Sequence, residues 1–476
     1  MKERILMIKK FFEEISQVPR ASFSEQAISD YLVNFAEQRG LRFIQDEKSN
    51  VIIFKDASAG YEHHPVVMLQ SHMDMVAEKN QDSDHDFEND PIDLIEKDGW
   101  LYANKTTLGA DDGAGVAYML AVLDDRELRH PALECVFTVE EEVGMGGAHH
   151  LDTSELKATR LIGLDSGGEK LVTISSSGGN RGVVTYPIKY ERSHKQQLVL
   201  RVRGLKGGHS GVEIDQERAN AVKVMGKVLV RLAHEFNLGF SSIEGGLKDN
   251  AIMRECNLVL GLKEEEEQAV IERVKHLEKD FQEVYSESDS GLRIECEVVA
   301  KACYSLSVDA TRELAKLLAL LPYGPIQKSL VIEDLVIASS NIGRIETTEN
   351  NVMLGLSMRS PHAFTLADIN LQVELISELC GAHVEFSNGY PGWVYDPESE
   401  LRTIITDTYR ELRGEEMILE ATHGGLELGV WKEKMPQLDI AAFGPIMEDI
   451  HTPDERLNLD SFARSYEHLV KVLERL

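Results

Sequence analysis

Residues 65–76 read PVVMLQSHMDMV, and this stretch decides how the N-terminal part of the chain folds. The run Pro65–Leu69 is continuously apolar, which is typical of a strand buried on both faces of a sheet. Similar runs recur at Leu133–Thr138 (LECVFT) and Leu161–Leu164 (LIGL), and helical stretches such as Gly113–Leu123 separate the runs. Strands that alternate with helices predict an α/β domain whose sheet is at least partly parallel.

Helices are predicted on the N-terminal side of these strands. Residues 22–40 have apolar residues at helical spacing, Ser22 and Glu25 at capping-box spacing, and Gly40 at the end. The opening residues, MKERILMIKKFFEEISQ, mix glutamates with apolar residues. They therefore predict an amphipathic helix and not a signal peptide.

The pattern changes near residue 186. From 186 to 391 the strands are longer and alternate polar with apolar residues, as in LVLRVRGL (198–205). Such alternation is typical of a sheet with one face in water. Strands and helices follow one another in two similar cycles, so we expect two ferredoxin-like halves in tandem.

After residue 391 the buried-strand pattern returns, for example in QLDIAAF (437–443). Residues 1–185 and 392–476 are therefore expected to form one mixed-sheet α/β domain. The α+β domain of residues 186–391 would be inserted into it. A length of 476 residues is compatible with two to three structural units.

The composition excludes several classes of function. The net charge is −31, and a field of that sign repels nucleic acid and anionic membranes. No apolar run approaches the ~20 residues that span a bilayer. The five cysteines are scattered and never form a CxxC pair, which argues against a disulfide framework and a cysteine zinc site. We expect a cytoplasmic protein whose acidity serves mainly solubility.

Histidine and acidic residues follow the predicted buried strands, where open α/β sheets bind their ligands. His72 and Asp74 are two residues apart, so their side chains point to the same side. Asp74 could hold the second imidazole nitrogen of His72, as a metal-ligating histidine requires. Asp165 follows LIGL, and His451 follows QLDIAAF in a polar loop. Each of these residues alone also fits an ordinary surface position.

Two acidic clusters add further candidate ligands. Asp111 and Asp112 lie in TLGADDGAG, where they could cap a helix or where Asp111 could bridge two cations. Glu140, Glu141 and Glu142 follow LECVFT and would repel one another without cations or protons. Nitrogen and oxygen ligands without cysteine suit Zn²⁺ and tolerate Mn²⁺ or Co²⁺. Two such ions ~3.5–4 Å apart can activate water against an amide, with a neighbouring glutamate as general base.

Five motifs resemble the metal-site blocks of the M20 metallopeptidases. They are HMDMV (72–76), TLGADDGAGVA (107–117), EEEVGMGGA (140–148), GLDSGGE (163–169) and GPIMEDIHTPDE (444–455). The resemblance is strongest to the aminoacyl-histidine dipeptidase (Xaa-His dipeptidase, peptidase D) branch. It extends to GLKGGHSG (204–211), NAIMRE (250–255), SMRS (357–360), YPGW (390–393) and HGGLELG (423–429).

The resemblance implies a role for each candidate ligand. His72 and Asp165 would hold one metal ion, Glu142 and His451 the other, and Asp111 would bridge the two.

It also implies that Glu141 is the general base, that Asp74 orients His72, and that the Asp111–Asp112 peptide bond is cis.

The same resemblance assigns substrate residues to the inserted domain, which would act as a lid. His209 would stabilise the oxyanion, and Asn250 and Arg359 would hold the substrate. Arg359 has the planar fork that suits a terminal carboxylate. His423 and Gly424 would form a substrate-side loop. His209 could serve its own chain or, in a homodimer, the partner's site.

Two positions depart from the branch, since Asp112 replaces asparagine and Met253 replaces proline. The activity implied is hydrolysis of Xaa-His or other dipeptides. One alternative is an M20 deacylase of N-acyl amino acids, and another is a non-catalytic metal- or peptide-binding protein on the same scaffold.

Overall fold

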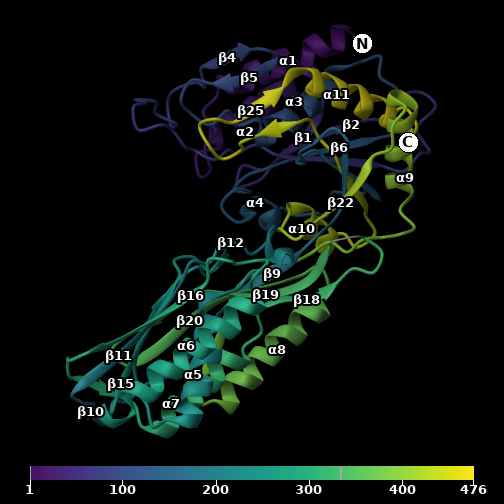
Figure 1. Cartoon of the computed structure of the whole chain (residues 1–476). Coiled ribbons are helices and arrows are strands. Elements are labelled where there is room, and N and C mark those ends of the chain that lie inside the picture. The colour runs from purple at the N-terminus through teal and green to yellow at the C-terminus, as the bar shows by residue number, and fades with distance from the viewer. Residues whose placement is uncertain (1, 333–334) are drawn as a thin grey trace. The chain divides into compact units, whose positions relative to one another are not determined.

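The computed structural model describes residues 2–332 and 335–476, which fold into two compact units (Figure 1). The first unit contains the residues up to Ser175, Val394–Ala421 and Leu426–Leu476. The second unit contains Ser176–Trp393 and Thr422–Gly425. The first boundary thus lies ten residues before the expected residue 186, and the second lies after Trp393 instead of after residue 391.

The main sheet of the first unit has the strand order β1-β2-β6-β3-β7-β23-β8-β22. Its centre, β6-β3-β7-β23, is parallel, whereas β1, β2 and β8 pair with their neighbours in antiparallel fashion. The strands are β1 (Arg42–Gln45), β2 (Val51–Lys55), β3 (Val67–His72), β6 (Leu133–Thr138), β7 (Arg160–Gly163), β8 (Leu171–Ser176), β22 (Ile418–Thr422) and β23 (Asp439–Ala442). The apolar runs predicted as buried strands form the four central strands, so the predicted mixed α/β fold is confirmed.

Helices cover this sheet and pack on one another through aromatic side chains. Tyr118 stacks on Phe462 with ring centroids 4.9 Å apart, and Phe12 meets Phe462 edge-on at 6.0 Å. These contacts join the first, third and last helices of the unit. Its helices are α1 (Lys2–Ser16), α2 (Gln26–Arg39), α3 (Ala110–Asp124), α4 (Gly146–His150), α9 (Glu400–Arg413), α10 (Glu427–Lys434) and α11 (Leu459–Leu473). No helix in the described part of the chain is long and apolar enough to cross a membrane.

A small antiparallel sheet of the first unit has the order β24-β25-β5-β4. Its strands are β4 (Leu94–Lys97), β5 (Trp100–Ala103), β24 (Met447–Glu448) and β25 (Arg456–Asn458). The loop between β24 and β25 contains His451, so this sheet fixes both ends of the loop that carries the last predicted ligand.

The second unit contains a long antiparallel sheet with the order β16-β11-β15-β13-β19-β20-β9-β21. Its strands are β9 (Gly178–Pro187), β11 (Gln196–Arg203), β13 (Gly239–Gly245), β15 (Cys256–Leu262), β16 (Arg293–Val299), β19 (Val336–Thr347), β20 (Asn351–Ser360) and β21 (His383–Tyr390). Short strands accompany them, namely β10 (Arg192–His194), β12 (Gly208–His209), β14 (Ala251–Ile252), β17 (Cys303–Ser305) and β18 (Gly324–Lys328). The short helices are η1 (Ile214–Gln216) and η2 (Glu264–Glu266).

Helices α5 (Ala221–Glu235), α6 (Glu267–Val284), α7 (Val308–Leu320) and α8 (Ala363–Leu379) lie along one side of this sheet (Figure 1). Their buried residues form a common core with alternate residues of the strands, including Leu354, Leu356 and Met358 of β20. Met253, which replaces the proline of the branch, is buried in the same core. The expected helices and alternating strands therefore share one hydrophobic layer.

Two ferredoxin-like halves are present, but they are nested and not in tandem. The first half runs β11-α5-β13-β15-α6-β16, and its strands are ordered β16-β11-β15-β13. The second half runs β9-α7-β19-β20-α8-β21, and its strands are ordered β19-β20-β9-β21. The whole first half is inserted after β9. Pairing of β13 with β19 joins the halves into one sheet.

The nested order explains why the predicted boundary at residue 186 falls inside a strand. β9 pairs with β20 from Gly178 to Pro187, so these ten residues belong to the second unit. The sequence GGNRGVVTYP contains glycines and polar residues at its start, which hide the alternation typical of a strand.

Candidate metal centre

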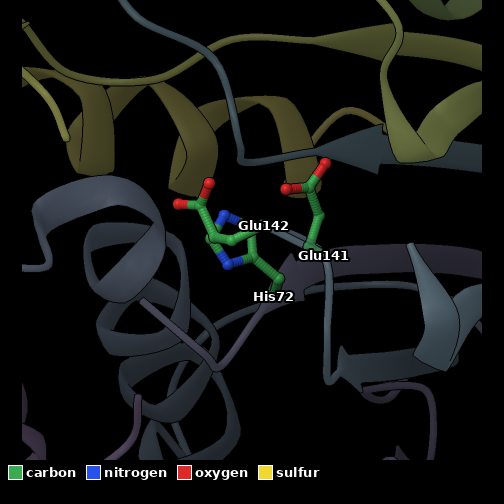
Figure 2. A group of neighbouring side chains, drawn as sticks. All are labelled: His72, Glu141 and Glu142. Atoms are coloured by element: carbon green, nitrogen blue, oxygen red, sulfur yellow. The ribbon is translucent and has the colours of Figure 1, made fainter. Parts of the chain in front are cut away.

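Parallel strands of the first unit end beside one another and carry most of the predicted ligands. His72 is the last residue of β3 and pairs in register with Thr138, the last residue of β6. Glu141 and Glu142 follow β6 directly, and Asp165 follows β7. Figure 2 shows the side chains of His72, Glu141 and Glu142 on the same side of these strand ends. The residues at these strand ends therefore lie together, at the edge where open parallel sheets bind their ligands.

Asp111 lies between the two histidines, in the first turn of α3. Its Oδ1 is 3.0 Å from Nε2 of His72, and its Oδ2 is 3.3 Å from Nε2 of His451. Asp165 lies on the His72 side, with Oδ2 4.0 Å from Nε2, and Glu142 lies 3.1 Å from Nε2 of His451. One oxygen of Asp111 thus faces each half of the cluster, the arrangement expected of a carboxylate that bridges two cations. The peptide bond that follows Asp111 is cis, as the resemblance implies.

The ligand atoms form groups compact enough for a metal ion, with all atoms of a group within 4.8 Å of one another. Two of the groups are His72 with Asp111 and Asp165, and Asp111 with Glu142 and His451. A third group combines His72 with Glu141 and Glu142, so proximity alone does not separate ligand from base. Their contacts do differ: Glu142 contacts His451, whereas the Glu141 carboxylate has no hydrogen-bond partner within residues 2–332 and 335–476.

The crowded carboxylates shift the acidities of the cluster. Burial, followed by the charge of Asp111, raises the pKa of Asp165 well above its ordinary value. Burial also raises the pKa of Glu141 to about 8. Hydrogen bonds to Asp111 and Glu142 raise the pKa of His451 to about 10. Such a cluster needs protons or cations among its acids, and its donor set of nitrogen and oxygen without sulfur fits Zn²⁺, Mn²⁺ or Co²⁺.

Asp74 holds the turn that follows β6 as well as the imidazole of His72. Its carboxylate accepts the backbone N–H of Glu141 at 3.1 Å, that of Glu142 at 3.3 Å, and the hydroxyl of Ser22 at 2.8 Å. Nδ1 of His72 lies 3.5 Å from the Asp74 carboxylate and 3.1 Å from the Asp74 backbone oxygen. The shorter distance makes the backbone oxygen the main partner of the imidazole. The carboxylate of Asp74 faces the imidazole of His72 and also holds the glutamate turn.

The expected capping box at Ser22 and Glu25 does not form, and helix α2 begins only at Gln26. Ser22 instead donates to Asp74, as described above. The Glu25 carboxylate accepts the backbone N–H of Phe23 at 2.9 Å and that of Glu140 at 3.1 Å. Ser22 and Glu25 therefore do not cap a helix. They connect the segment before α2 to Asp74 and to the turn that contains Glu140.

Two buried charged residues support the Asp111 loop and were not predicted. The Glu455 carboxylate accepts the backbone N–H groups of four consecutive residues, 108–111, at 2.7–3.3 Å. The Arg20 guanidinium donates to the backbone oxygens of Met73 and Gly109. Glu455 belongs to the same motif as His451, HTPDE (451–455), and this proximity in the sequence could have predicted that Glu455 lies at the metal site. Arg20 lies in a loop that no pattern marks.

We expect Glu455→Gln to weaken metal binding about 10- to 100-fold, as loss of a residue that supports a ligand generally does. A glutamine places an amide N–H group against backbone N–H groups and leaves part of the Asp111 loop without acceptors. Competition with a chromophoric chelator measures the affinity. The matched control is Glu448→Gln, since Glu448 pairs with Arg456 at the surface. Equal affinity of the two variants would contradict the supporting role of Glu455.

The substrate residues predicted for the second unit also lie together. Nη1 of Arg359 donates to Oη of Tyr390 at 2.9 Å and to the backbone oxygen of His423 at 3.3 Å. Nε2 of His423 is 2.7 Å from Oγ of Ser339. Arg359 is buried, and the hydrogen bonds of its guanidinium within residues 2–332 and 335–476 go to a hydroxyl and a backbone oxygen, not to a carboxylate.

His209 lies on β12, and Asn250 directly precedes the neighbouring strand β14. His209 pairs with Ala251 in the β12–β14 ladder, and the backbone oxygen of Asn250 accepts the N–H of Ser210 at 2.9 Å. A Cβ atom on Gly211 would lie 2.9 Å from His209 and 3.4 Å from Cζ of Arg359. Gly211 therefore lets the histidine lie close to the guanidinium.

Gly424 is held by backbone contacts within the same unit. Its N–H donates to Oγ1 of Thr422 at 3.0 Å, and its backbone oxygen accepts the N–H of Ser177 at 2.9 Å. The Gly424 loop is thereby attached to the start of β9.

Known proteins resemble this chain over nearly its whole length. Residues 68–475 match the model of peptidase family M20/M25/M40. The chain is 32% identical over 471 residues to the cytosol non-specific dipeptidase of Escherichia coli, covering 98% of this chain and 96% of that protein. The crystal structure of aminoacylhistidine dipeptidase from Vibrio alginolyticus superposes with a TM-score of 0.95 at 34% identity, covering 98% and 96% of the two chains. The aminopeptidase PepT of Bacillus cereus shares the fold at 19% identity and a TM-score of 0.61.

Proposed function

The chain belongs to peptidase family M20/M25/M40, and from that premise we propose that it hydrolyses dipeptides with a pair of divalent metal ions. The observation that carries the proposal is the position of Asp111, whose two carboxylate oxygens face different histidines at 3.0 and 3.3 Å. Two relatives that cover nearly the whole chain are named dipeptidases, which supports a metallo-dipeptidase.

His72 and Asp165 would hold one ion, Glu142 and His451 the other, and Asp111 would be shared. Zn²⁺ is the ion that best suits two imidazoles and three carboxylates, and Mn²⁺ or Co²⁺ can replace it. Such ions would polarise the scissile carbonyl and lower the pKa of water.

Glu141 is the proposed general base, because its carboxylate lies beside the ligands without a hydrogen-bond partner in the described part of the chain. It would take a proton from the attacking water and later give it to the leaving amino group. Asp74 would orient His72, and it would also keep the Glu141 turn in place through the backbone N–H groups whose hydrogen bonds it accepts.

Residues of the second unit are proposed to act on the substrate. Arg359 would bind the terminal carboxylate, since the hydrogen bonds of its buried guanidinium within residues 2–332 and 335–476 go to no acid. His209 would donate a hydrogen bond to the oxyanion. Asn250, His423 and Gly424 would line the bound dipeptide. The unit would then act as the lid implied by the family resemblance.

We expect the metal-loaded protein to hydrolyse Ala-His with a kcat/KM about 10²-fold or more above that for N-acetyl-histidine. Polar groups that bind the amino-terminal residue would be left unpaired by the acetyl group. Chromatographic quantification of released histidine measures both reactions, and Ala-Leu serves as a test of breadth. Faster hydrolysis of N-acetyl-histidine would favour the deacylase alternative. Stable binding of Ala-His without cleavage would favour a non-catalytic binding protein.

We also propose that the protein acts in the cytoplasm on small peptides. The Escherichia coli relative is named a cytosol enzyme. A net charge of −31 disfavours nucleic acid as a partner.

A further inference from the structure

Arg359 and Tyr390 lie on two strands that are separated by a third. Arg359 of β20 is directly opposite Gly179 of β9, and Tyr390 of β21 is opposite the same glycine. Residues directly opposite one another in an antiparallel sheet point to the same face. The missing side chain of Gly179 therefore opens a path along this face, through which the Tyr390 hydroxyl reaches Nη1 of Arg359 at 2.9 Å.

A one-residue irregularity in β21 places the tyrosine on this face. Ser387 is opposite Arg181, so regular pairing would place residue 389 opposite Gly179. The register shifts between Ser387 and Tyr390, and Tyr390 takes that place instead. Since side chains alternate along a strand, a shift of one residue transfers Tyr390 from one face to the other. Leu354, Leu356 and Met358 face the core, so Arg359 and Tyr390 share the opposite face.

Two glycines leave little freedom to the tyrosine ring. A Cβ atom on Gly179 would lie 2.7 Å from Oη of Tyr390, and a Cβ atom on Gly425 would lie 2.5 Å from its Cε2. Both distances are shorter than a van der Waals contact, so the ring lies in a slot that only glycine permits. The position of the hydroxyl is therefore built into the sheet.

The hydrogen bonds at Nη1 leave one edge of the guanidinium unused. Nη1 donates to Tyr390 and to the backbone oxygen of His423. Nε is buried and has no hydrogen-bond partner in the described residues. A carboxylate binds two parallel N–H groups of an arginine, and the edge formed by Nε and Nη2 offers such a pair. The edge formed by Nε and Nη2 is thus the part of the guanidinium that no hydrogen bond in the described residues uses.

We propose that Tyr390 is a positioning residue for the substrate carboxylate, which acts by fixing the guanidinium of Arg359 in this orientation. The inference rests on the proposed function, in which Arg359 binds the terminal carboxylate of a dipeptide. It predicts that the tyrosine hydroxyl contributes to substrate affinity and hardly to the chemical step.

The test compares Tyr390→Phe with the unsubstituted protein on Ala-His and on Ala-His amide, which lacks the carboxylate. We expect the KM for Ala-His to rise about 10-fold, the effect of losing one hydrogen bond to a charged group, with kcat changed less than about twofold. The KM for the amide should not change. Tyr304→Phe is the control, since Tyr304 is an exposed tyrosine of the same unit.

Gly179→Ala provides a second variant that leaves Tyr390 in the chain, because its methyl group would lie 2.7 Å from the Tyr390 hydroxyl and 2.8 Å from the backbone oxygen of Met358. It should reproduce the selective rise in KM for Ala-His, and its thermal unfolding shows whether the unit is intact. Equal KM changes for acid and amide, or no change for either, in Tyr390→Phe would overturn the positioning role. Arg359→Lys tests the proposed function separately: if it too treats acid and amide alike, the carboxylate assignment itself fails.

Discussion

The Glu141→Ala variant should lose about 10³- to 10⁴-fold in kcat for Ala-His, within the range that general acid–base catalysis contributes. It should still bind both metal ions, because the five proposed ligands remain. The physical reason is the missing proton acceptor, since the Glu141 carboxylate lies beside His72 and Glu142 but is not among the five proposed ligands. Steady-state kinetics together with elemental analysis of bound metal measure the two properties.

Glu140→Ala is the matched control for this variant. Glu140 belongs to the same run of three glutamates, but its carboxylate pairs with Lys48 at 2.6 Å. The control should retain its metal, with kcat within about twofold, as surface substitutions generally do. Near-normal activity of Glu141→Ala, or a loss of metal equal to its loss of activity, would contradict the role of Glu141 as base.

The Asp111→Asn variant should bind at most one metal ion per chain and lose about 10³-fold or more in kcat/KM. Asparagine has nearly the same size but supplies one oxygen, whereas Asp111 places one oxygen toward each histidine. Loss of the second ion removes several kcal/mol of transition-state stabilisation, which corresponds to about three orders of magnitude. Elemental analysis after dialysis against limiting Zn²⁺ measures the stoichiometry.

Asp112→Asn is the control for Asp111→Asn, because it makes the same chemical change at the next residue of the turn. Burial raises the pKa of Asp112 to about 7, and its Oδ1 accepts the N–H of Gly115 at 3.1 Å. An asparagine oxygen can accept the same bond, and the branch that the chain resembles has asparagine here. The variant should therefore keep both ions and most of its activity. Two ions in Asp111→Asn would show that Asp111 is not a bridge.

The central strands could be predicted because their sequences are continuously apolar. Each predicted run overlaps one central strand, and its bounds agree with those of the strand to within three residues. The runs are Pro65–Leu69, Leu133–Thr138, Leu161–Leu164 and 437–443, and the strands are β3, β6, β7 and β23. Parallel strands buried on both faces allow few polar residues, so the first polar residues after them mark the strand ends.

Other parts of the site could not be predicted from local patterns. Ser22 and Glu25 have capping-box spacing, yet Ser22 donates to Asp74, which lies 52 positions away in the chain. Glu455 accepts the N–H groups of residues more than 340 positions away. These contacts depend on which distant segments of the chain pack together. The periodicity of a single sequence predicts helices and strands but not such packing.

The nesting of the two ferredoxin-like halves could not be predicted for the same reason. Both β9 and β19 have strand-like stretches, but only pairing shows that β9 belongs with β20 and not with β11. The sequence order of elements is compatible with halves in tandem, and the hydrogen-bond ladders decide between the arrangements.

Anomalous diffraction at the zinc edge, from crystals of the zinc-loaded protein, tests the two-metal centre most directly. We expect two peaks ~3.5–4 Å apart, one beside His72 and Asp165 and one beside Glu142 and His451, with Asp111 in contact with both. A single peak, or two peaks that Asp111 does not bridge, would contradict the proposed centre.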